Sequence, residues 1–420
     1  MAELRGIEYL RNKLNTKSTR VLTRYKYYEM KNVARDMGIS TPPELKNFKE
    51  VLGWCGKAVD SIADRLMFRE FENDNFNLTE IFNMNNPDVL YDSAVRSALI
   101  SSCCFIYISQ DSTGYPRLEV IDGGSATGVI NTITGLLDEG YAVLEQNPDT
   151  EKPVVEAYFE PGKTTYYKSG EAPWTAYYNV DYPLLVPMIY KPSTKRPFGH
   201  SRISRACMSI VDSALRTIKR SEISAEFFAF PQKYAIGVAD DALEMNKWKA
   251  SMSALLTMTR DENGNIPTLG QFQQQSMAPH TEQLKMFAAL FGGETGLTLD
   301  DLGFSTGNPA SADAIKAAHE NLRLAARKAQ GNFGTGLLNA GYLAACVRDD
   351  YRYLRKQFYL TRPTWEPIFE PDAAMLSAIG DGAIKLNQAV PGYMNKDNLR
   401  NLTGIDASKL PVPVDKTGGA

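Results

Sequence analysis

Residues 303–307 of this chain have the spacing G-x-S-x-G, with Ser305 at its centre. In α/β-hydrolases this spacing holds a nucleophilic serine on a strained turn between a strand and a helix, and an Asp and a His later in the chain activate it. His319 is the one histidine that follows Ser305. A helix that begins near Ser311 would carry His319 about 12 Å from its start, since each residue adds ~1.5 Å. That distance is too long for a hydrogen bond to Ser305, so a serine hydrolase is a disfavoured alternative.

The other polar motifs predict no metal or cofactor. The adjacent carboxylates Asp300 and Asp301 could hold Mg²⁺, but no phosphate-binding loop is near them, which favours a solvated loop. The stretch "GNFGTG" (331–336) follows a helix, whereas a dinucleotide-binding loop follows a strand, so we predict a break at the end of that helix. Each histidine stands apart from other ligand types, so no zinc site is expected. The histidines are His200, His280 and His319.

Composition limits the class of protein. The 420 residues suggest two or three domains, and a hydrophobic share of 43% allows a sizeable core. With 46 Lys and Arg against 49 Asp and Glu, the net charge is −3, which disfavours tight DNA binding but leaves room for weak contact along a channel. The five cysteines have no C-x-x-C spacing, and Cys103 and Cys104 lie in an apolar run, which predicts buried thiols in a reducing compartment. The charged N-terminus and the lack of a long apolar run predict a soluble product made in the cytoplasm.

The first half of the chain changes character near residue 101. Residues 2–101 are predicted to be helical, with one helix from Leu52 to Leu66 and a second that begins with Pro87 near its first position. Residues 102–190 contain short β-branched and aromatic runs separated by turn signals, which predict an antiparallel meander. The stretch Asp122–Gly124 is predicted to be a turn. The predicted strands are "CFIYIS", "RLEVID", "YAVLEQ", "PVVEAYFE" and "KTTYYKS".

The second half is predicted to begin with a helix from about Arg202 to Phe228, some 40 Å long at ~1.5 Å per residue. Its narrow apolar stripe favours packing against neighbouring helices. Pro231 ends this helix, and a small α/β insert follows, with a helix around Trp248. Pro279 opens another helix, and a loop with five glycines comes next. The apolar stripe of the first helix consists of Ile203, Cys207, Ile210, Ala214 and Ile218.

A long Ala-rich helix follows the loop, capped by Asn308-Pro309 or Ser311. A seam of small residues recurs along it at coiled-coil-like spacing. Its charged residues are placed for pairing three or four positions apart, and they form either a solvated face or a face toward a neighbouring subunit or a polyanion. The seam is Ile315, Ala318, Leu322, Ala325 and Ala329, and the charged residues are Lys316, Glu320, Arg323 and Arg327. A strand at "RPTWEPIFEP" and two short helices complete the chain.

This order of elements resembles the portal proteins of tailed double-stranded-DNA bacteriophages, in the siphophage branch. The resemblance covers nearly the whole chain. Its most specific parts are "PFGHSRIS", "QQQSMAPHTEQLKMFAALFGG" and "FSTGNPASADAIKAAHENLRLAARKAQGNFG". It implies an α+β fold with a helical and β-meander wing, two stem helices, a small α/β clip, a long kinked helix and a short helical crown. The implied segments are 1–201 wing, 202–229 first stem helix, 230–278 clip, 279–293 second stem helix, 294–311 tunnel loop, 312–370 long helix and returning wing strand, 371–410 crown, and 411–420 disordered tail.

The resemblance implies a ring-forming conduit for DNA, usually dodecameric, at one capsid vertex of the virion. It implies no enzymatic activity and no membrane contact. The implied partners are other copies of the chain, double-stranded DNA bound weakly and without sequence preference, the terminase large subunit, a head–tail adaptor, and the major capsid and scaffolding proteins. The implied uses are genome packaging, head–tail joining and genome ejection. Another phage head structural protein, such as a capsid or adaptor subunit, remains the second alternative.

Candidate site residues follow from these segments. The tunnel loop carries carboxylates and no Lys or Arg, which suits a surface that DNA must pass without being held. Its candidates for facing DNA are Glu294, Thr295, Asp300, Asp301, Phe304, Ser305 and Asn308. The candidates for the channel or subunit interface are Lys316, Arg323, Arg327, Arg216, Lys219 and Arg220. The candidates for docking a partner on the clip are Trp248, Gln271, Phe272 and Gln273.

Overall fold

The computed structural model describes nine stretches of the chain, which are 4–34, 49–150, 152–229, 233–236, 266, 268–271, 276–304, 312–369 and 371–405. These stretches form two units. The first consists of Met1–Tyr28, Lys57–Ser204 and Ala312–Ala420, and the second consists of Glu29–Gly56 and Arg205–Ser311. In the described residues every strand pair is antiparallel, and helices and strands are both plentiful, so a mixed α/β chain is confirmed.

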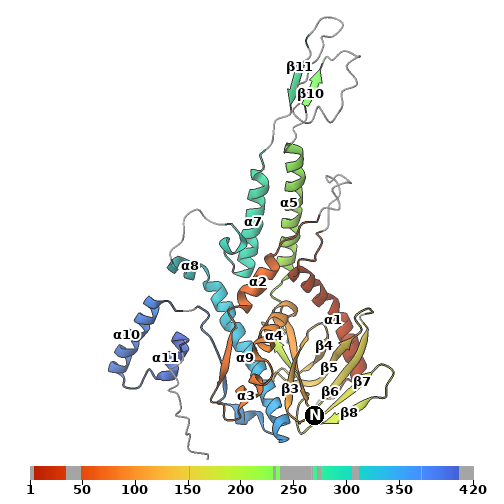
Figure 1. Ribbon diagram of the computed structural model, residues 1–420, viewed down its shortest axis with the longest axis vertical. Coiled ribbons are helices and arrows are strands. Elements are labelled where there is room, and N and C mark those ends of the chain that lie inside the picture. Colours follow the sequence, from red (N-terminus) through yellow and green to blue (C-terminus); the bar gives the residue numbers. More distant parts are fainter. Residues whose placement is uncertain are drawn as a thin grey trace, which may run out of the picture. The chain divides into compact units, whose positions relative to one another are not determined.

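Two antiparallel sheets form the centre of the first unit (Figure 1). In the smaller sheet, β2 (Cys103–Gln110) lies between β3 (Pro116–Asp122) and β9 (Leu185–Ile189). The five predicted strands are present, but they belong to two sheets and not to one meander. The Asp122–Gly124 turn is confirmed by a 3.0 Å hydrogen bond from the Ser125 amide to the Asp122 carbonyl. The larger sheet runs in chain order through β4 (Ala126–Ile130), β5 (Leu137–Gln146), β6 (Pro153–Glu160), β7 (Lys163–Lys168) and β8 (Trp174–Tyr177).

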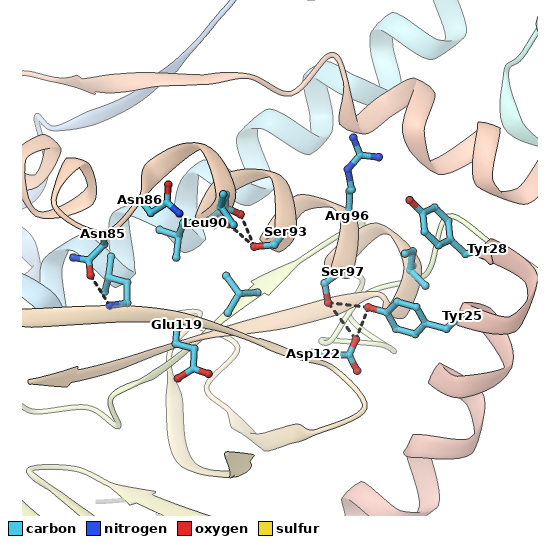
Figure 2. A pocket seen from close by; sticks show the side chains of 14 residues that line it. Tyr25, Tyr28, Asn85, Asn86, Leu90, Ser93, Arg96, Ser97, Glu119 and Asp122 are labelled. Carbon is cyan, nitrogen blue, oxygen red and sulfur yellow. Dashed lines mark hydrogen bonds between the residues drawn. The ribbon is translucent and has the colours of Figure 1, made fainter. Parts of the chain in front are cut away.

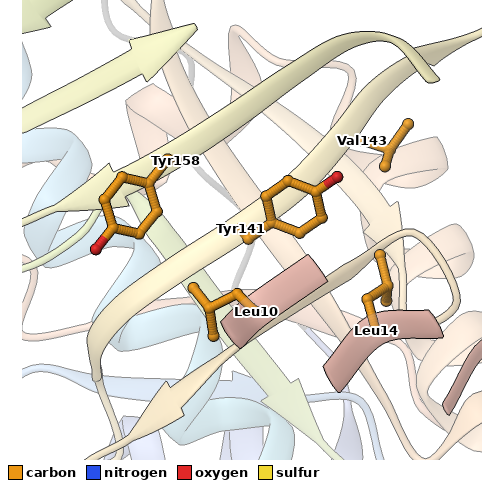
Figure 3. Packing of buried hydrophobic residues seen from close by; sticks show 5 residues of the cluster. All are labelled: Leu10, Leu14, Tyr141, Val143 and Tyr158. Carbon is orange, nitrogen blue, oxygen red and sulfur yellow. The ribbon is translucent and has the colours of Figure 1, made fainter. Parts of the chain in front are cut away.

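Helix α1 (Ile7–Tyr28) packs against the larger sheet through one apolar face (Figure 3). Leu10 and Leu14, one turn apart on the helix, contact a buried cluster completed by Tyr141 and Val143 of β5 and Tyr158 of β6. These five side chains are nearly removed from water, and at ~25 cal/mol per Å² their burial fixes the helix on the sheet.

A strand residue caps the start of α1. The Glu139 carboxylate accepts hydrogen bonds from the backbone amides of Arg5 (3.0 Å) and Gly6 (3.1 Å), and from the Tyr158 hydroxyl (2.9 Å). Glu139 is only 1% exposed. An acidic group at a helix N-terminus satisfies amides that lack partners in the helix and complements its dipole. The buried charge of Glu139 is therefore committed to holding α1.

The expectation that residues 2–101 are helical is wrong at one place. Helices α2 (Trp54–Ala63), α3 (Leu78–Asn83) and α4 (Pro87–Ser101) are present, with Pro87 in the first turn of α4 as predicted. Between α2 and α3 lies β1 (Phe68–Glu72), which pairs with β12 (Arg362–Trp365). The partner of β1 lies almost three hundred residues later in the sequence. No local sequence pattern therefore predicts this five-residue strand. The predicted strand near residue 362 is thereby confirmed.

Helix α9 (Glu320–Asp349) corrects the predicted break at 331–336, because it continues through all three glycines. A Cβ on Gly334 would lie 2.6 Å from the Pro363 ring, and one on Gly336 would lie 3.2 Å from Met188. These glycines let β12 and β9 approach the helix closely. Helix α8 (Ala312–Ala318) precedes α9, and His319 between them interrupts the long helix.

After α9 the chain forms a short 3₁₀ turn, η4 (Arg355–Phe358), then β12, and then two helices, α10 (Ala373–Ala389) and α11 (Lys396–Thr403), as predicted. Asp372 caps α10 by accepting a 2.8 Å hydrogen bond from the Met375 amide. The expected tail at 411–420 lies outside the described residues.

The second unit contains α5 (Arg205–Ala229) and α7 (Ala278–Thr295), which lie side by side (Figure 1). Strands β10 (Lys233–Ile236) and β11 (Thr268–Gln271) form a ribbon between them in sequence, and the 3₁₀ turn η3 (Asp300–Leu302) follows α7. The two expected stem helices are both present as helices. Within the described residues, no helix has both the length and the apolar character to span a bilayer.

Candidate functional site

The α5–α7 pair is held by a buried face on each helix. On α5 the buried side chains include Cys207, Val211, Ala214 and Leu215. The predicted stripe was therefore only partly right, because Ile210 and Ile218 are half-buried and Val211 and Leu215 take their place. A polar link joins the helices where the Thr217 hydroxyl donates a 3.1 Å hydrogen bond to Gln283.

Helix α7 leaves a second face uncovered. Its buried residues lie in its last two turns, where the Phe291 ring lies 5.6 Å from that of Trp54. Met286 and Leu290, one turn apart, are 50% and 54% exposed. These two large apolar side chains are therefore neighbours on the exposed surface of the helix.

The end of α7 differs from the expected start of the loop at residue 294. Glu294 and Thr295 belong to the last turn of the helix, and Gly296 ends it with a φ of 74°. Thr295 is 3% exposed, and its hydroxyl donates a 2.7 Å hydrogen bond to the Phe291 carbonyl. The prediction that Thr295 faces DNA is therefore wrong, because its side chain is buried and bonded to its own helix.

The described part of the loop is folded. Asp301 accepts hydrogen bonds from the amide and the hydroxyl of Thr298, both at 2.9 Å, and so organises the turn η3. Leu297 and Leu302 are buried. A Cβ on Gly292 would lie 2.6 Å from the Leu297 carbonyl oxygen, so the loop folds back tightly on the end of α7.

The remaining loop candidates divide into two groups. Asp300 is exposed, and Phe304 is half-buried, with its amide donating a 3.0 Å hydrogen bond to the Leu299 carbonyl. Ser305 and Asn308 lie outside the described residues. His319, the only partner a Ser305 nucleophile could have later in the chain, donates from Nδ1 to the Ile315 carbonyl at 2.8 Å. This bond holds the ring against its own helix and does not involve Nε2, the nitrogen that acts as the base in a serine hydrolase.

Two of the candidate cations on α8 and α9 have partners in the chain. Lys316 pairs with Asp372 at 3.0 Å, and Arg323 makes two 2.7 Å hydrogen bonds to Glu320. The bond from Arg323 lowers the pKa of Glu320 and raises that of Arg323. Arg327 is exposed and forms no ion pair with the described residues. The predicted seam also shifts, because Leu322 and Ala329 are buried with Ala326 and Phe333, whereas Ile315 is 49% exposed.

The cations of α5 lie along a helix rather than in a pocket. Arg216 is half-buried and donates a 2.8 Å hydrogen bond to the Ser213 hydroxyl, and Arg220 is exposed. Lys219 is half-buried. In the ribbon, Gln271 pairs with Lys233 at the end of β11. The other candidates of the insert, Trp248, Phe272 and Gln273, lie outside the described residues.

A pocket beside α4 is lined by two carboxylates, Glu119 and Asp122 (Figure 2). Asp122 accepts hydrogen bonds from Tyr25 (2.6 Å) and Ser97 (3.2 Å), which tie α1 and α4 to β3. Arg96 forms ion pairs with three aspartates. These are Asp60 of α2, Asp64 just after α2, and Asp92 of α4. Glu119 also lines this pocket, where partial desolvation raises the pKa of its carboxyl although the residue is exposed. None of the side chains that line it is a histidine or cysteine, and the described residues contain no cluster of metal-ligand type.

A protein-family model described as "Phage portal protein, SPP1 Gp6-like" matches residues 7–368. A relative named portal protein in Mycobacterium phage D29 is 23% identical over 410 residues, which covers 91% of this chain and 82% of the relative. A portal protein of Mycobacterium phage L5 is 22% identical over 404 residues, with 89% and 80% covered.

Solved structures are more distant. "Neck of native GTA particle computed with C12 symmetry" aligns with a TM-score of 0.43 and 14% identity, and covers 92% of this chain and 100% of that one. "Neck of empty GTA particle computed with C6 symmetry" aligns with a TM-score of 0.42 and 12% identity, and covers 91% and 98%.

Proposed function

Because this chain belongs to the SPP1 Gp6-like family of phage portal proteins, we propose that its copies form a ring at one vertex of the capsid and that double-stranded DNA passes through the ring's central channel. As a member of this family it is a structural phage component and not an enzyme. The ring, dodecameric as the sequence resemblance implies, serves genome packaging with the terminase, head–tail joining and genome ejection.

The observation that supports a ring most directly is the uncovered apolar face of α7. Met286 and Leu290 are each about half exposed, although α7 packs along α5. A patch that pairs with a different surface on the next copy gives a head-to-tail contact, and such contacts close into rings when the rotation between copies allows it. We assign this face to the contact between neighbouring subunits.

The segments take the roles that the family resemblance implies. Residues 1–201 form the wing, which β12 rejoins by pairing with β1. Helices α5 and α7 form the stem, and residues 230–278 between them form the clip that meets the terminase and then the adaptor. The crown consists of α10 and α11. The ribbon of β10 and β11 between the two stem helices supports the clip assignment.

The last turn of α7 and the loop after it contact DNA weakly. Glu294 and Asp300 are exposed carboxylates, and the described part of the segment carries no cation to neutralise a phosphate. Each phosphate that a cation neutralises releases counterions and raises the affinity for DNA. A ring of cations would therefore hold the duplex in place. An acidic loop repels the backbone and keeps each contact short-lived.

Electron micrographs of the purified full-length chain test the ring. Rings with a central hole are expected, and native mass spectrometry should give a single dominant multiple of the subunit mass. Monomers alone at every salt concentration, after long incubation at high protein concentration, would contradict the proposal. Closed shells or solid discs without a hole would instead support another head structural protein.

A further inference from the structure

A basic pocket lies in the first unit, between α1, the edge strand β4 and the turn at residues 195–199. Its volume is about 460 Å³, within the range of ligand sites. Helix α1 lines it with Lys13, Lys17, Arg20 and Arg24. Arg5 and two cations of the turn, Lys195 and Arg196, complete the basic lining, and none of the residues that line this pocket is acidic.

None of the cations that line this pocket forms an ion pair with a described residue, although Glu139 lies close enough to Lys13 to favour its charge. The charged groups of Lys17, Arg20, Lys195 and Arg196 form no ion pair or hydrogen bond with any described residue. Lys13 and Arg24 donate to the neutral carbonyls of Gly128 (2.5 Å) and Ser101 (2.7 Å). The nearby buried carboxylate Glu139 already accepts three hydrogen bonds at the start of α1.

Holding these cations together costs stability. The four cations of α1 that line the pocket are spaced four, three and four residues apart, and like charges at such spacings on a helix repel each other. Burial first, and then Lys17 and Arg5, lower the pKa of Lys13. Burial first, and then Arg20 and Arg196, lower the pKa of Arg24. Since the whole chain has a net charge of −3, its composition does not account for this cluster.

The shape and the floor of the pocket indicate the kind of ligand. From Lys13 to Arg24 the row of cations spans about 16 Å at ~1.5 Å per residue, the length of about five extended residues. Apolar side chains, among them Phe105, Phe198 and Ile130, also line the pocket. Duplex DNA keeps its bases stacked inside and presents mainly phosphates and sugars, whereas a peptide that mixes acidic and apolar residues places carboxylates and apolar side chains on one short segment.

We propose that this pocket binds an acidic, partly apolar peptide segment of a partner protein. Carboxylates of the segment pair with Lys17, Arg20, Lys195 and Arg196, and an apolar side chain packs against Phe198 and Ile130. The proposal concerns the first unit alone and does not depend on ring formation, so a failure of either proposal leaves the other standing.

Fluorescence anisotropy tests the proposal with the full-length chain and a labelled peptide of about ten residues that alternates Glu and Leu, a length that spans the row of cations. The Lys17→Gln/Arg20→Gln and Lys195→Gln/Arg196→Gln variants should each bind about tenfold more weakly, a loss of two charge-assisted contacts. These four side chains are exposed, so the variants should fold normally. Lys26→Gln/Lys385→Gln is the matched control, because it removes two exposed cations away from the pocket.

Each outcome decides the question. Peptides that alternate Gln with Leu, or Glu with Ser, should bind more weakly than the Glu–Leu peptide, and hydrogen exchange with bound peptide should slow in residues 13–24 and 191–199. The proposal would be overturned by an equal loss in the control variant, or by no binding of the Glu–Leu peptide at low salt. A duplex DNA oligomer that binds more tightly than the peptide, with the same dependence on the pocket variants, would identify a nucleic-acid site instead.

Discussion

Gly292 and Gly293 are neighbours near the end of α7, but they differ in the space available for a Cβ atom. A Cβ on Gly292 would lie 2.6 Å from the Leu297 carbonyl oxygen, whereas a Cβ on Gly293 meets nothing within 4 Å. We expect Gly292→Ala to lower the free energy of unfolding by about 1–3 kcal/mol, as overpacking does. Gly293→Ala should be neutral or stabilising by up to about 1 kcal/mol, since alanine favours a helix. Urea unfolding of both variants measures the difference, and equal values would show that the loop does not fold back on α7.

Ser305 gives a second prediction for a single residue. Ser305→Ala should leave ring assembly and the yield of infectious phage unchanged, because a serine hydroxyl needs an adjacent base to become a nucleophile. His319 is the one histidine that follows Ser305, and the helical spacing places it too far away for a hydrogen bond. Complementation of a phage that lacks this gene measures the yield. Uptake of a fluorophosphonate label at Ser305, or a loss of infectivity with normal assembly, would restore the hydrolase alternative.

The cysteines predict a chemical result. All five are free and buried, and burial raises the pKa of Cys346 from 9.0 to about 11. A thiol-specific aromatic disulfide reagent at pH 8 should therefore modify none of them in the folded protein and all of them in denaturant, because the thiolate is the reactive form. Since the folded pKa is the higher one, the neutral thiol contributes stability below pH 9 that is lost as the pH rises toward 11. Rapid modification of any cysteine in the folded protein would contradict this picture.

At the scale of elements, the last turn of α7 and the segment after it combine a folded turn with exposed carboxylates. Asp301 organises η3, so changing it would test folding as well as charge. Glu294 and Asp300 are the exposed carboxylates. We expect the Glu294→Lys/Asp300→Lys variant to form rings but to package DNA more slowly at low salt. The new lysines would contact phosphates, and such contacts are stronger at low salt.

A packaging assay at two ionic strengths measures this effect, and added salt should restore the rate. Glu294→Gln/Asp300→Gln is the control, since it removes the negative charge without adding a cation and should slow packaging less. Wild-type rates for the lysine variant at low salt would show that this loop does not face the DNA.

At the scale of the whole molecule, the uncovered face of α7 predicts how assembly can be broken. Met286→Glu/Leu290→Glu should yield a folded monomer, because two carboxylates replace the apolar side chains of the proposed contact and are costly to bury. Lys285→Glu, an exposed position beside them, should still form rings. Sizes from light scattering together with circular dichroism distinguish loss of assembly from loss of fold, and rings of normal size in the double variant would place the subunit contact elsewhere.

Much of this protein follows from local sequence. Pro87 and Pro279 mark helices that begin where proline is tolerated, and the alternating runs between residues 102 and 190 form strands. These features are encoded within a few neighbouring residues, which is why they can be predicted. The resemblance in the order of elements also led to the portal family, which the match over residues 7–368 confirms.

Only the tertiary structure decided which distant segments meet. In the structure, β1 pairs with β12, and α9 continues through the glycines at 331–336. Thr295 is buried at the end of α7, and Lys316 forms an ion pair with Asp372. The tertiary structure also brought α1 and the turn at 195–199 together around one basic pocket. Each of these results depends on where the chain returns after tens or hundreds of residues. That return is set by the packing of whole faces, and the pattern of any one segment does not contain it.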